Sequence, residues 1–158
     1  MRSIILPVII ILIVVIGGII MTNKKSNVPI ETLKSFSFGY STGTAMYANV
    51  EYDIECSEKC IATIKPNEVS EENAKKIEID EKMIQELITF LNENKVYKWD
   101  GFQKSDPYVL DGNSFHFYFH EKNGRGISAT GYMMYPKNYG VVRGKLDQMF
   151  QTLYEANK

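Results

Sequence analysis

This sequence has few cysteines and histidines and no excess of positive charge, and each of these shortages limits the functions open to the protein. The 158 residues include two cysteines and two histidines, so few residues are candidates for disulfides or metal ligands. Between residues 31 and 158 the chain carries 15 lysine and arginine residues against 19 acidic residues, a net charge of −4. Nucleic-acid-binding proteins present a basic surface to the phosphates, so we expect no nucleic-acid partner. No internal repeat or low-complexity tract is visible, and the length after the N-terminal segment suits one domain.

One long apolar run is present, and it lies at the N-terminus from Ile4 to Met21. As a helix this run would extend about 27 Å, close to the thickness of the hydrocarbon core of a bilayer. The run lacks a small-x-small cleavage site, and no cysteine near its end could carry a lipid. We therefore expect a transmembrane anchor or uncleaved signal at residues 1–22 and a tether at residues 23–30. A cleaved signal peptide is the alternative.

The charges that flank the apolar run do not fix its orientation. Arg2 and the α-amino group on one side balance Lys24 and Lys25 on the other, so the positive-inside rule favours neither topology. The cysteines favour the outside, because Cys56 and Cys60 bracket the tip of a predicted hairpin where a disulfide could close the turn. We therefore predict an extracytoplasmic domain on a single-pass anchor in the cell membrane. A cytoplasmic domain with two reduced cysteines stays open as the alternative.

Hydrophobic periodicity predicts strands and helices in separate runs. Apolar residues at spacings of three and four predict one helix at residues 81–94 and a second at residues 141–155. Alternating or short apolar runs predict strands at residues 35–41, 46–55, 60–65, 76–80, 114–121 and 126–132. This order favours an α+β fold: one domain at residues 31–158, with an antiparallel sheet of four to six strands and two helices packed on one face.

The stretch from Lys98 to Gly140 contains the clearest hairpin and the only tryptophan. Between residues 114 and 121, three phenylalanines alternate with two histidines and a tyrosine, which predicts a strand with a phenylalanine core face. Asn123-Gly124 follows, and Asn-Gly is typical of the tight turn of a hairpin. Residues 126–132 then return as the second strand.

Four residues of this stretch are the predicted ligand-binding site: Trp99, Tyr132, Met134 and Tyr135. Tyrosine and tryptophan rings combine an apolar face with a polar tip, so they suit contacts with sugars and peptides. Rings of this kind also fill the core and rim of small β-rich domains, which is the alternative explanation. No catalytic residue, metal ligand or cofactor is predicted.

Two patterns that suggest chemistry have simpler explanations. Gly39 to Gly43 matches the G-x-S-x-G nucleophile elbow, but the following residues alternate as a strand where the elbow needs a helix. The spacing of His116 and His120 would suit a zinc site on a helix. On a strand, four residues span about 13 Å, which is too far for two ligands of one zinc ion.

Three loop aspartates, Asp100, Asp106 and Asp111, are too sparse for a calcium-binding loop and are typical of turns. They nevertheless keep one rival function open. In a small envelope hydrolase, His116 or His120 would work with Asp100 or Asp111 as acid and base.

Four short motifs carry a resemblance to known sequences: Trp99–Phe102 (WDGF), Leu110–Gly112 (LDG), Gly131–Met133 (GYM) and Tyr135–Tyr139 (YPKNY). Over about residues 33–155 the chain resembles a family of uncharacterised proteins from Gram-positive bacteria. Those proteins are small, anchored or secreted through an N-terminal segment, and have one α+β domain that ends in a helix. The resemblance implies the fold and a place in the cell envelope, and it brings no activity or catalytic residue with it.

These features predict a membrane-anchored, extracytoplasmic, non-catalytic domain. Residues 4–21 are expected to lie in the membrane, and the aromatic residues are expected to bind an envelope protein or a cell-wall ligand. A structural or regulatory subunit that acts through its transmembrane helix is the other alternative.

Overall fold

The computed structural model describes residues 27–41, 49–66 and 73–157 of the chain. Within them the elements run β1 (Ser35–Ser41), β2 (Asn49–Cys56), β3 (Cys60–Lys65), β4 (Lys75–Ile79), α2 (Glu81–Glu93), the 3-10 helix η2 (Val96–Trp99), β5 (Phe102–Ser105), β6 (Ser114–His120), β7 (Gly126–Tyr132) and α3 (Tyr139–Ala156). None of the helices in these ranges is long and apolar enough to cross a membrane. The predicted anchor at residues 1–22 and the first half of the predicted tether, residues 23–26, lie outside the described residues.

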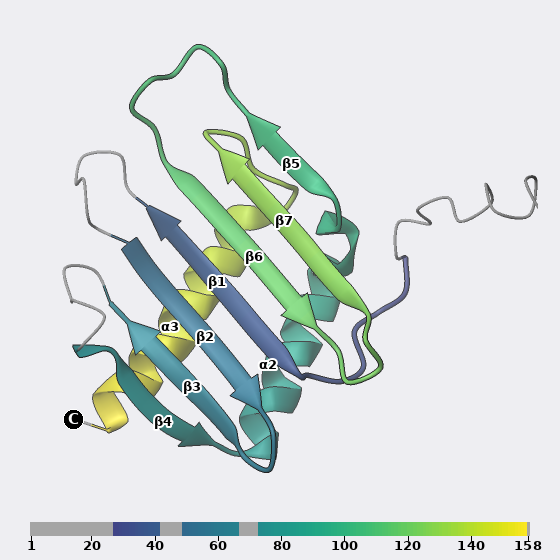
Figure 1. Cartoon of the computed structure of the whole chain (residues 1–158), viewed down its shortest axis with the longest axis vertical. Coiled ribbons are helices and arrows are strands. Elements are labelled where there is room, and N and C mark those ends of the chain that lie inside the picture. Colours follow the sequence, from purple (N-terminus) through teal and green to yellow (C-terminus); the bar gives the residue numbers. More distant parts are fainter. Residues whose placement is uncertain (1–26, 42–48, 67–72, 158) are drawn as a thin grey trace, which may run out of the picture.

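The strands form one mixed sheet in the order β4-β3-β2-β1-β6-β7-β5, and both helices cover the same face of it (Figure 1). The α+β prediction is confirmed, but two details of the predicted sheet are wrong. The described residues form seven strands instead of four to six, and β5 pairs with β7 in parallel. β5 escapes prediction because it has only four residues, three of them exposed, and therefore shows no apolar alternation.

The helix-covered face of the sheet carries a core of aromatic side chains. Phe38 of β1 lies opposite Phe117 of β6, and both side chains are fully buried. From the helix layer, the ring of Phe150 in α3 stacks on Tyr52 of β2 with the ring centroids 4.6 Å apart. The predicted phenylalanine face of the β6–β7 hairpin therefore lies in the centre of the core.

Both α-helices bury the stripe that their periodicity predicts. Asp80 caps α2, because its carboxylate accepts a hydrogen bond from the backbone N–H of Met83 at 2.9 Å. The buried residues of α2 are Ile84, Leu87, Ile88 and Leu91, and those of α3 are Tyr139, Val142, Leu146 and Phe150. No described element covers the opposite face of the sheet (Figure 1), on which β1 and β6 place polar residues such as Ser37, His116 and Tyr118.

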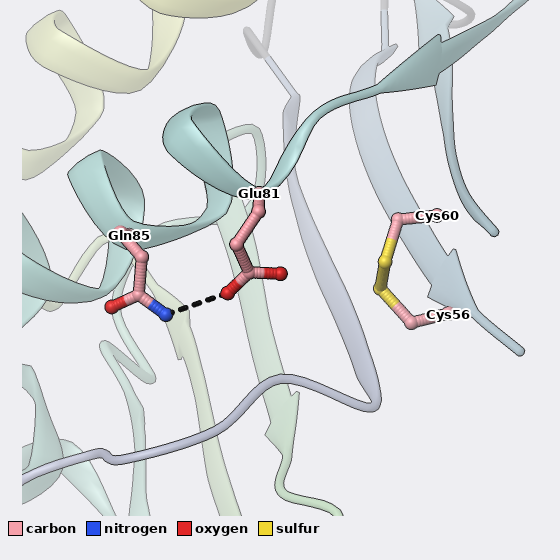
Figure 2. Close-up of a disulfide and its surroundings, with 4 residues drawn as sticks. All are labelled: Cys56, Cys60, Glu81 and Gln85. Carbon is pink, nitrogen blue, oxygen red and sulfur yellow. Dashed lines mark hydrogen bonds between the residues drawn. A yellow bond between two sulfur atoms is a disulfide. The ribbon is translucent and has the colours of Figure 1, made fainter. Parts of the chain in front are cut away.

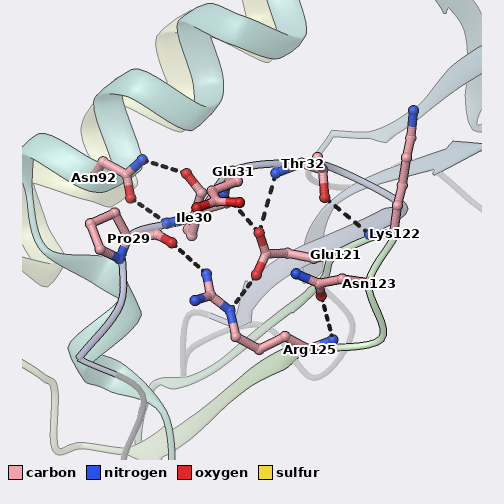
Figure 3. A network of polar contacts seen from close by, with 9 residues as sticks. All are labelled: Pro29, Ile30, Glu31, Thr32, Asn92, Glu121, Lys122, Asn123 and Arg125. Atoms are coloured by element: carbon pink, nitrogen blue, oxygen red, sulfur yellow. Dashed lines mark hydrogen bonds and ion pairs between the residues drawn. The ribbon is translucent and has the colours of Figure 1, made fainter.

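The segment before β1 is fixed to the domain by a polar network (Figure 3). Glu121, directly after β6, accepts hydrogen bonds from the backbone N–H groups of Glu31 and Thr32 at 2.7 and 3.2 Å. Its other carboxylate oxygen is ion-paired with Arg125, which also donates to the carbonyl of Pro29 at 2.6 Å. The chain therefore arrives at β1 from the predicted tether in a defined position.

A disulfide joins Cys56 and Cys60 across the β2–β3 turn, beside the first turns of α2 (Figure 2). Both cysteine side chains pack against the core. On the neighbouring helix, Gln85 donates a hydrogen bond to the carboxylate of Glu81 at 2.8 Å. The bridge therefore closes the turn on the helix-covered side of the sheet.

Reducing this disulfide is expected to lower the free energy of unfolding by about 2 kcal/mol, the loop-closure entropy for a bridge between residues four positions apart. Urea unfolding of the full chain in detergent, with and without a reductant, measures the change. The Cys56→Ser/Cys60→Ser variant is the control, because a reductant should leave its unfolding midpoint unchanged. An equally unchanged midpoint for the wild-type chain would show that the short bridge contributes no stability.

Candidate functional site

Two of the four predicted ligand-binding residues meet at one cavity of about 650 Å³. Trp99, the last residue of η2, is only 3% exposed, and its indole N–H donates to the carbonyl of Lys137 at 3.0 Å. Tyr135 lies on the loop between β7 and α3 and is 39% exposed. We call this cavity, walled by the rings of Trp99, Phe102 and Tyr135, the Trp99–Tyr135 pocket.

The other two predicted residues lie close to this pocket but do not line it. Met134 precedes Tyr135 on the same loop and is also 39% exposed. Tyr132 ends β7, and its hydroxyl donates to the carbonyl of Leu110 at 2.7 Å, so it joins the β5–β6 loop to the sheet. Leu110 itself is almost fully exposed, which leaves a group of apolar side chains at this end of the sheet.

The walls of the pocket are continuous with the aromatic core. The Trp99 ring meets Phe117 edge-on with the centroids 5.4 Å apart, and Phe102 packs against Phe115 at 6.2 Å. Tyr135 stacks on Tyr139, the first residue of α3, at 4.6 Å. Because these rings are supported by buried neighbours, the walls are held in place before any ligand arrives.

Four lysines that were not predicted as site residues line the Trp99–Tyr135 pocket: Lys95, Lys98, Lys104 and Lys137. Glu93 is the only acidic residue among the described residues that line it. None of the four lysines is ion-paired with another described residue. The lysines come from η2 and the turn before it, from β5 and from the β7–α3 loop, so no run or spacing in the sequence marks them as a group.

The backbone is unusual at the same place. Three non-glycine residues in the described ranges have positive φ angles: Lys95 at 56°, Met133 at 55° and Asn138 at 66°. Lys95 and Asn138 both line the pocket, and Met133 begins the loop that carries Tyr135. Residues other than glycine rarely adopt positive φ angles, and those that do are concentrated at functional sites. The backbone geometry therefore marks the same pocket as the lysines do.

His116 lies on the open face of the sheet, within reach of a serine and two acids. Its Nε2 atom is 3.3 Å from the Oγ atom of Ser37. Burial lowers the pKa of His116, and the carboxylates of Glu51 and Asp53 oppose that shift. Burial also raises the pKa of Asp53, and a hydrogen bond from Ser37 opposes it. The serine lies between the acid and the histidine, whereas a catalytic triad needs the histidine between the other two.

The partners proposed for a hydrolase lie elsewhere. The carboxylate of Asp100 accepts a hydrogen bond from the backbone N–H of Ser128 at 3.2 Å, which fixes the turn into β5. Asp111 is exposed on the β5–β6 loop, and His120 is exposed at the end of β6. Among the described residues, no group of three or more histidine, cysteine or acidic side chains could hold a metal ion.

The serine of the G-x-S-x-G pattern ends β1 and lies in the sheet. The Oγ atom of Ser41 is 2.7 Å from the Oγ atom of Ser114, its cross-strand neighbour on β6. The residues that follow, from 42 to 48, lie outside the described ranges.

A second pocket, of about 310 Å³, lies between the sheet and α3. One carboxylate oxygen of Asp147 accepts hydrogen bonds from the hydroxyls of Tyr40 and Tyr52, at 3.0 and 2.9 Å. Arg143 is ion-paired with the other oxygen and lies over the Tyr40 ring, 3.9 Å from its centroid. Burial, with the charge of Asp147 as the next cause, raises the pKa of Tyr52. Asp147 and Arg143 are already paired with each other, whereas the lysines of the Trp99–Tyr135 pocket are not ion-paired with described residues. This second pocket is therefore the weaker candidate for a ligand-binding site.

Neither a scan against protein-family models nor a comparison with curated proteins finds a match to this chain. The function proposed below therefore rests on the residues of the Trp99–Tyr135 pocket and on the sequence of the N-terminal segment.

Proposed function

We propose that the protein is a membrane-anchored, extracytoplasmic, non-catalytic domain that binds an envelope protein or cell-wall ligand in the Trp99–Tyr135 pocket. The observation that carries the binding function is the pocket itself, whose aromatic walls are supported by the core while none of its four lysines is ion-paired within the described ranges. Binding sites combine apolar walls with a few polar groups in this way.

Two further features support the proposed location. The apolar run at residues 4–21 has the length of a membrane span, which would make residues 1–22 an anchor. The Cys56–Cys60 disulfide is typical of proteins that fold outside the reducing cytoplasm. Because residues 29–32 are hydrogen-bonded to the domain, only residues 23–28 would separate the domain from the proposed anchor.

The rival proposal, a small envelope hydrolase, receives less support from the geometry. His116 has a hydroxyl neighbour in Ser37, which is the one observation in its favour. However, the acid of that cluster, Asp53, is hydrogen-bonded to Ser37, and no described carboxylate is hydrogen-bonded to the imidazole, as a triad would require. Asp100, one of the loop aspartates suggested as its partner, is engaged with the backbone of β7.

The binding proposal predicts that photo-cross-linking from the pocket rim will be position-specific. A benzophenone amino acid at Met134, beside the pocket, is expected to give an adduct with an envelope component in intact cells. The matched control is the same amino acid at Tyr118, which is 38% exposed against 39% for Met134 but lies on the open face of the sheet.

Protease added outside the same cells should remove both probes, since the domain is proposed to be extracytoplasmic. Equal adducts from both positions would argue against a site at the pocket. A domain protected from protease in intact cells would contradict the proposed location and direct the search to cytoplasmic partners.

A further inference from the structure

The charge around the Trp99–Tyr135 pocket is opposite to that of the domain as a whole. The domain carries a net charge of −4, whereas the residues that line the pocket include four lysines and one glutamate. A local excess of positive charge on an acidic protein attracts anions and repels cations. The ligand is therefore expected to be negatively charged.

The number of lysines indicates more than one negative group on that ligand. All four lysines are exposed and none is ion-paired with a described residue, so each ammonium group keeps its hydrogen-bond donors available. They also approach the cavity from separate elements: Lys95 and Lys98 from the η2 side, Lys104 from β5 and Lys137 from the loop before α3. A single small anion could contact one side of a cavity of about 650 Å³, but a chain of anionic groups could contact all of them.

The aromatic walls suit the part of the ligand that links its anionic groups. The rings of Trp99, Phe102 and Tyr135 line the same cavity, and Lys104 lies over the Phe102 ring with its Nζ atom 5.6 Å from the ring centroid. The cavity thus places ammonium groups and ring faces side by side. We infer that the Trp99–Tyr135 pocket binds a polyanion, a chain that carries several phosphate or carboxylate groups; this rests on the proposed binding function and specifies the ligand class.

The single tryptophan provides a direct readout, because Trp99 lines the pocket. The full-length chain in a neutral detergent is titrated with short-chain polyphosphate while Trp99 fluorescence is recorded. A saturable change that weakens with salt is expected, because ion pairs at an exposed site are screened. No saturable change would overturn the inference, provided that circular dichroism shows the chain to be folded.

Charge reversal at two pocket lysines tests the site. Lys98→Glu/Lys137→Glu is expected to weaken polyphosphate binding by about tenfold or more, since each charge-assisted hydrogen bond contributes on the order of a tenfold change in affinity. Lys82→Glu/Lys145→Glu makes the same change of net charge on exposed residues of α2 and α3, away from the pocket, and should bind within about twofold of wild type. Equal weakening by both variants would show that the attraction comes from net charge and not from the pocket.

Two further titrations separate the sources of the anion. Sodium orthophosphate at the same concentration of phosphate groups is expected to bind far more weakly than polyphosphate. Equal binding would contradict the inference that the ligand is a polyanion. Phosphatidylglycerol vesicles are compared with phosphatidylcholine vesicles. Binding to the anionic vesicles without binding to soluble polyphosphate would also overturn it, because the ligand would then be a membrane surface.

The Met134 photo-cross-linking experiment keeps the two proposals apart. If the Lys98→Glu/Lys137→Glu variant has lost polyphosphate binding but still gives the position-specific adduct, the binding function stands and the inference of a polyanionic ligand is wrong. If neither the adduct nor polyphosphate binding is found with the wild-type chain, both proposals fail.

Discussion

Replacing Glu121 with alanine is expected to lower the free energy of unfolding by about 3–5 kcal/mol, the range for removing one partner of a buried ion pair. Glu121 is the one buried charged residue in the described part of the chain, with 1% of its surface exposed. Its removal leaves the Arg125 guanidinium without its counter-charge and the N–H groups of Glu31 and Thr32 without their acceptor.

The controls for this prediction separate charge from hydrogen bonding. Glu121→Gln keeps an oxygen for the two backbone N–H groups but loses the ion pair, so an intermediate loss is expected. Glu78→Ala removes an exposed ion pair with Lys59 and should change stability by about 1 kcal/mol or less. Urea unfolding of the full chain in detergent measures all three variants. A Glu121→Ala loss no larger than that of Glu78→Ala would show that the network contributes little.

The effect of Glu121 also concerns how the domain is attached to its proposed anchor. Ile30, the last residue of the predicted tether, is 2% exposed, and its backbone exchanges two hydrogen bonds of 2.8 Å with the side chain of Asn92 in α2. Glu121 and Arg125 hold the residues on either side of it. Residues 29–32 therefore belong to the domain, so under the proposed anchoring only the residues before Pro29 would separate the domain from the bilayer.

The sequence predicts those parts of the fold that depend on neighbours a few residues away. The alternation of β6 and the apolar stripe of α2 can be recognised because each repeats within one element. β5 has no such repeat. Its place beside β7 depends on Asp100, which accepts from the backbone of β7, and on Gly101, whose N–H donates to the carbonyl of Ser128 at 2.9 Å.

In the candidate site too, only the features that depend on residues near one another in the sequence could be predicted. Trp99 and Tyr135 could be selected as aromatic residues, but their meeting with four lysines depends on contacts between distant segments. Trp99 donates to the carbonyl of Lys137, 38 positions away, and the Ser37–His116 contact joins residues 79 positions apart. Lysines at such separations look like ordinary surface residues in a sequence, and only the fold brings them to one cavity.

Replacing Phe117 with alanine is expected to lower the free energy of unfolding by about 3–5 kcal/mol, because its ring is fully buried and would leave a cavity at the centre of the core. The ring meets Phe36 and Trp99 edge-on, with centroids 5.7 and 5.4 Å away. Trp99 fluorescence during urea unfolding measures the change and also reports whether the wall of the pocket shifts before the domain unfolds.

The neighbouring residue is the matched control. Tyr118 follows Phe117 in β6 and points to the open face, so Tyr118→Ala should cost about 1 kcal/mol or less. The two variants together test the register of the hairpin, because a shift of one residue would exchange the two faces of the strand. Equal losses from both would contradict a core built on the phenylalanines of β6. A loss confined to Phe117→Ala would support both that core and the aromatic support that it gives to the pocket.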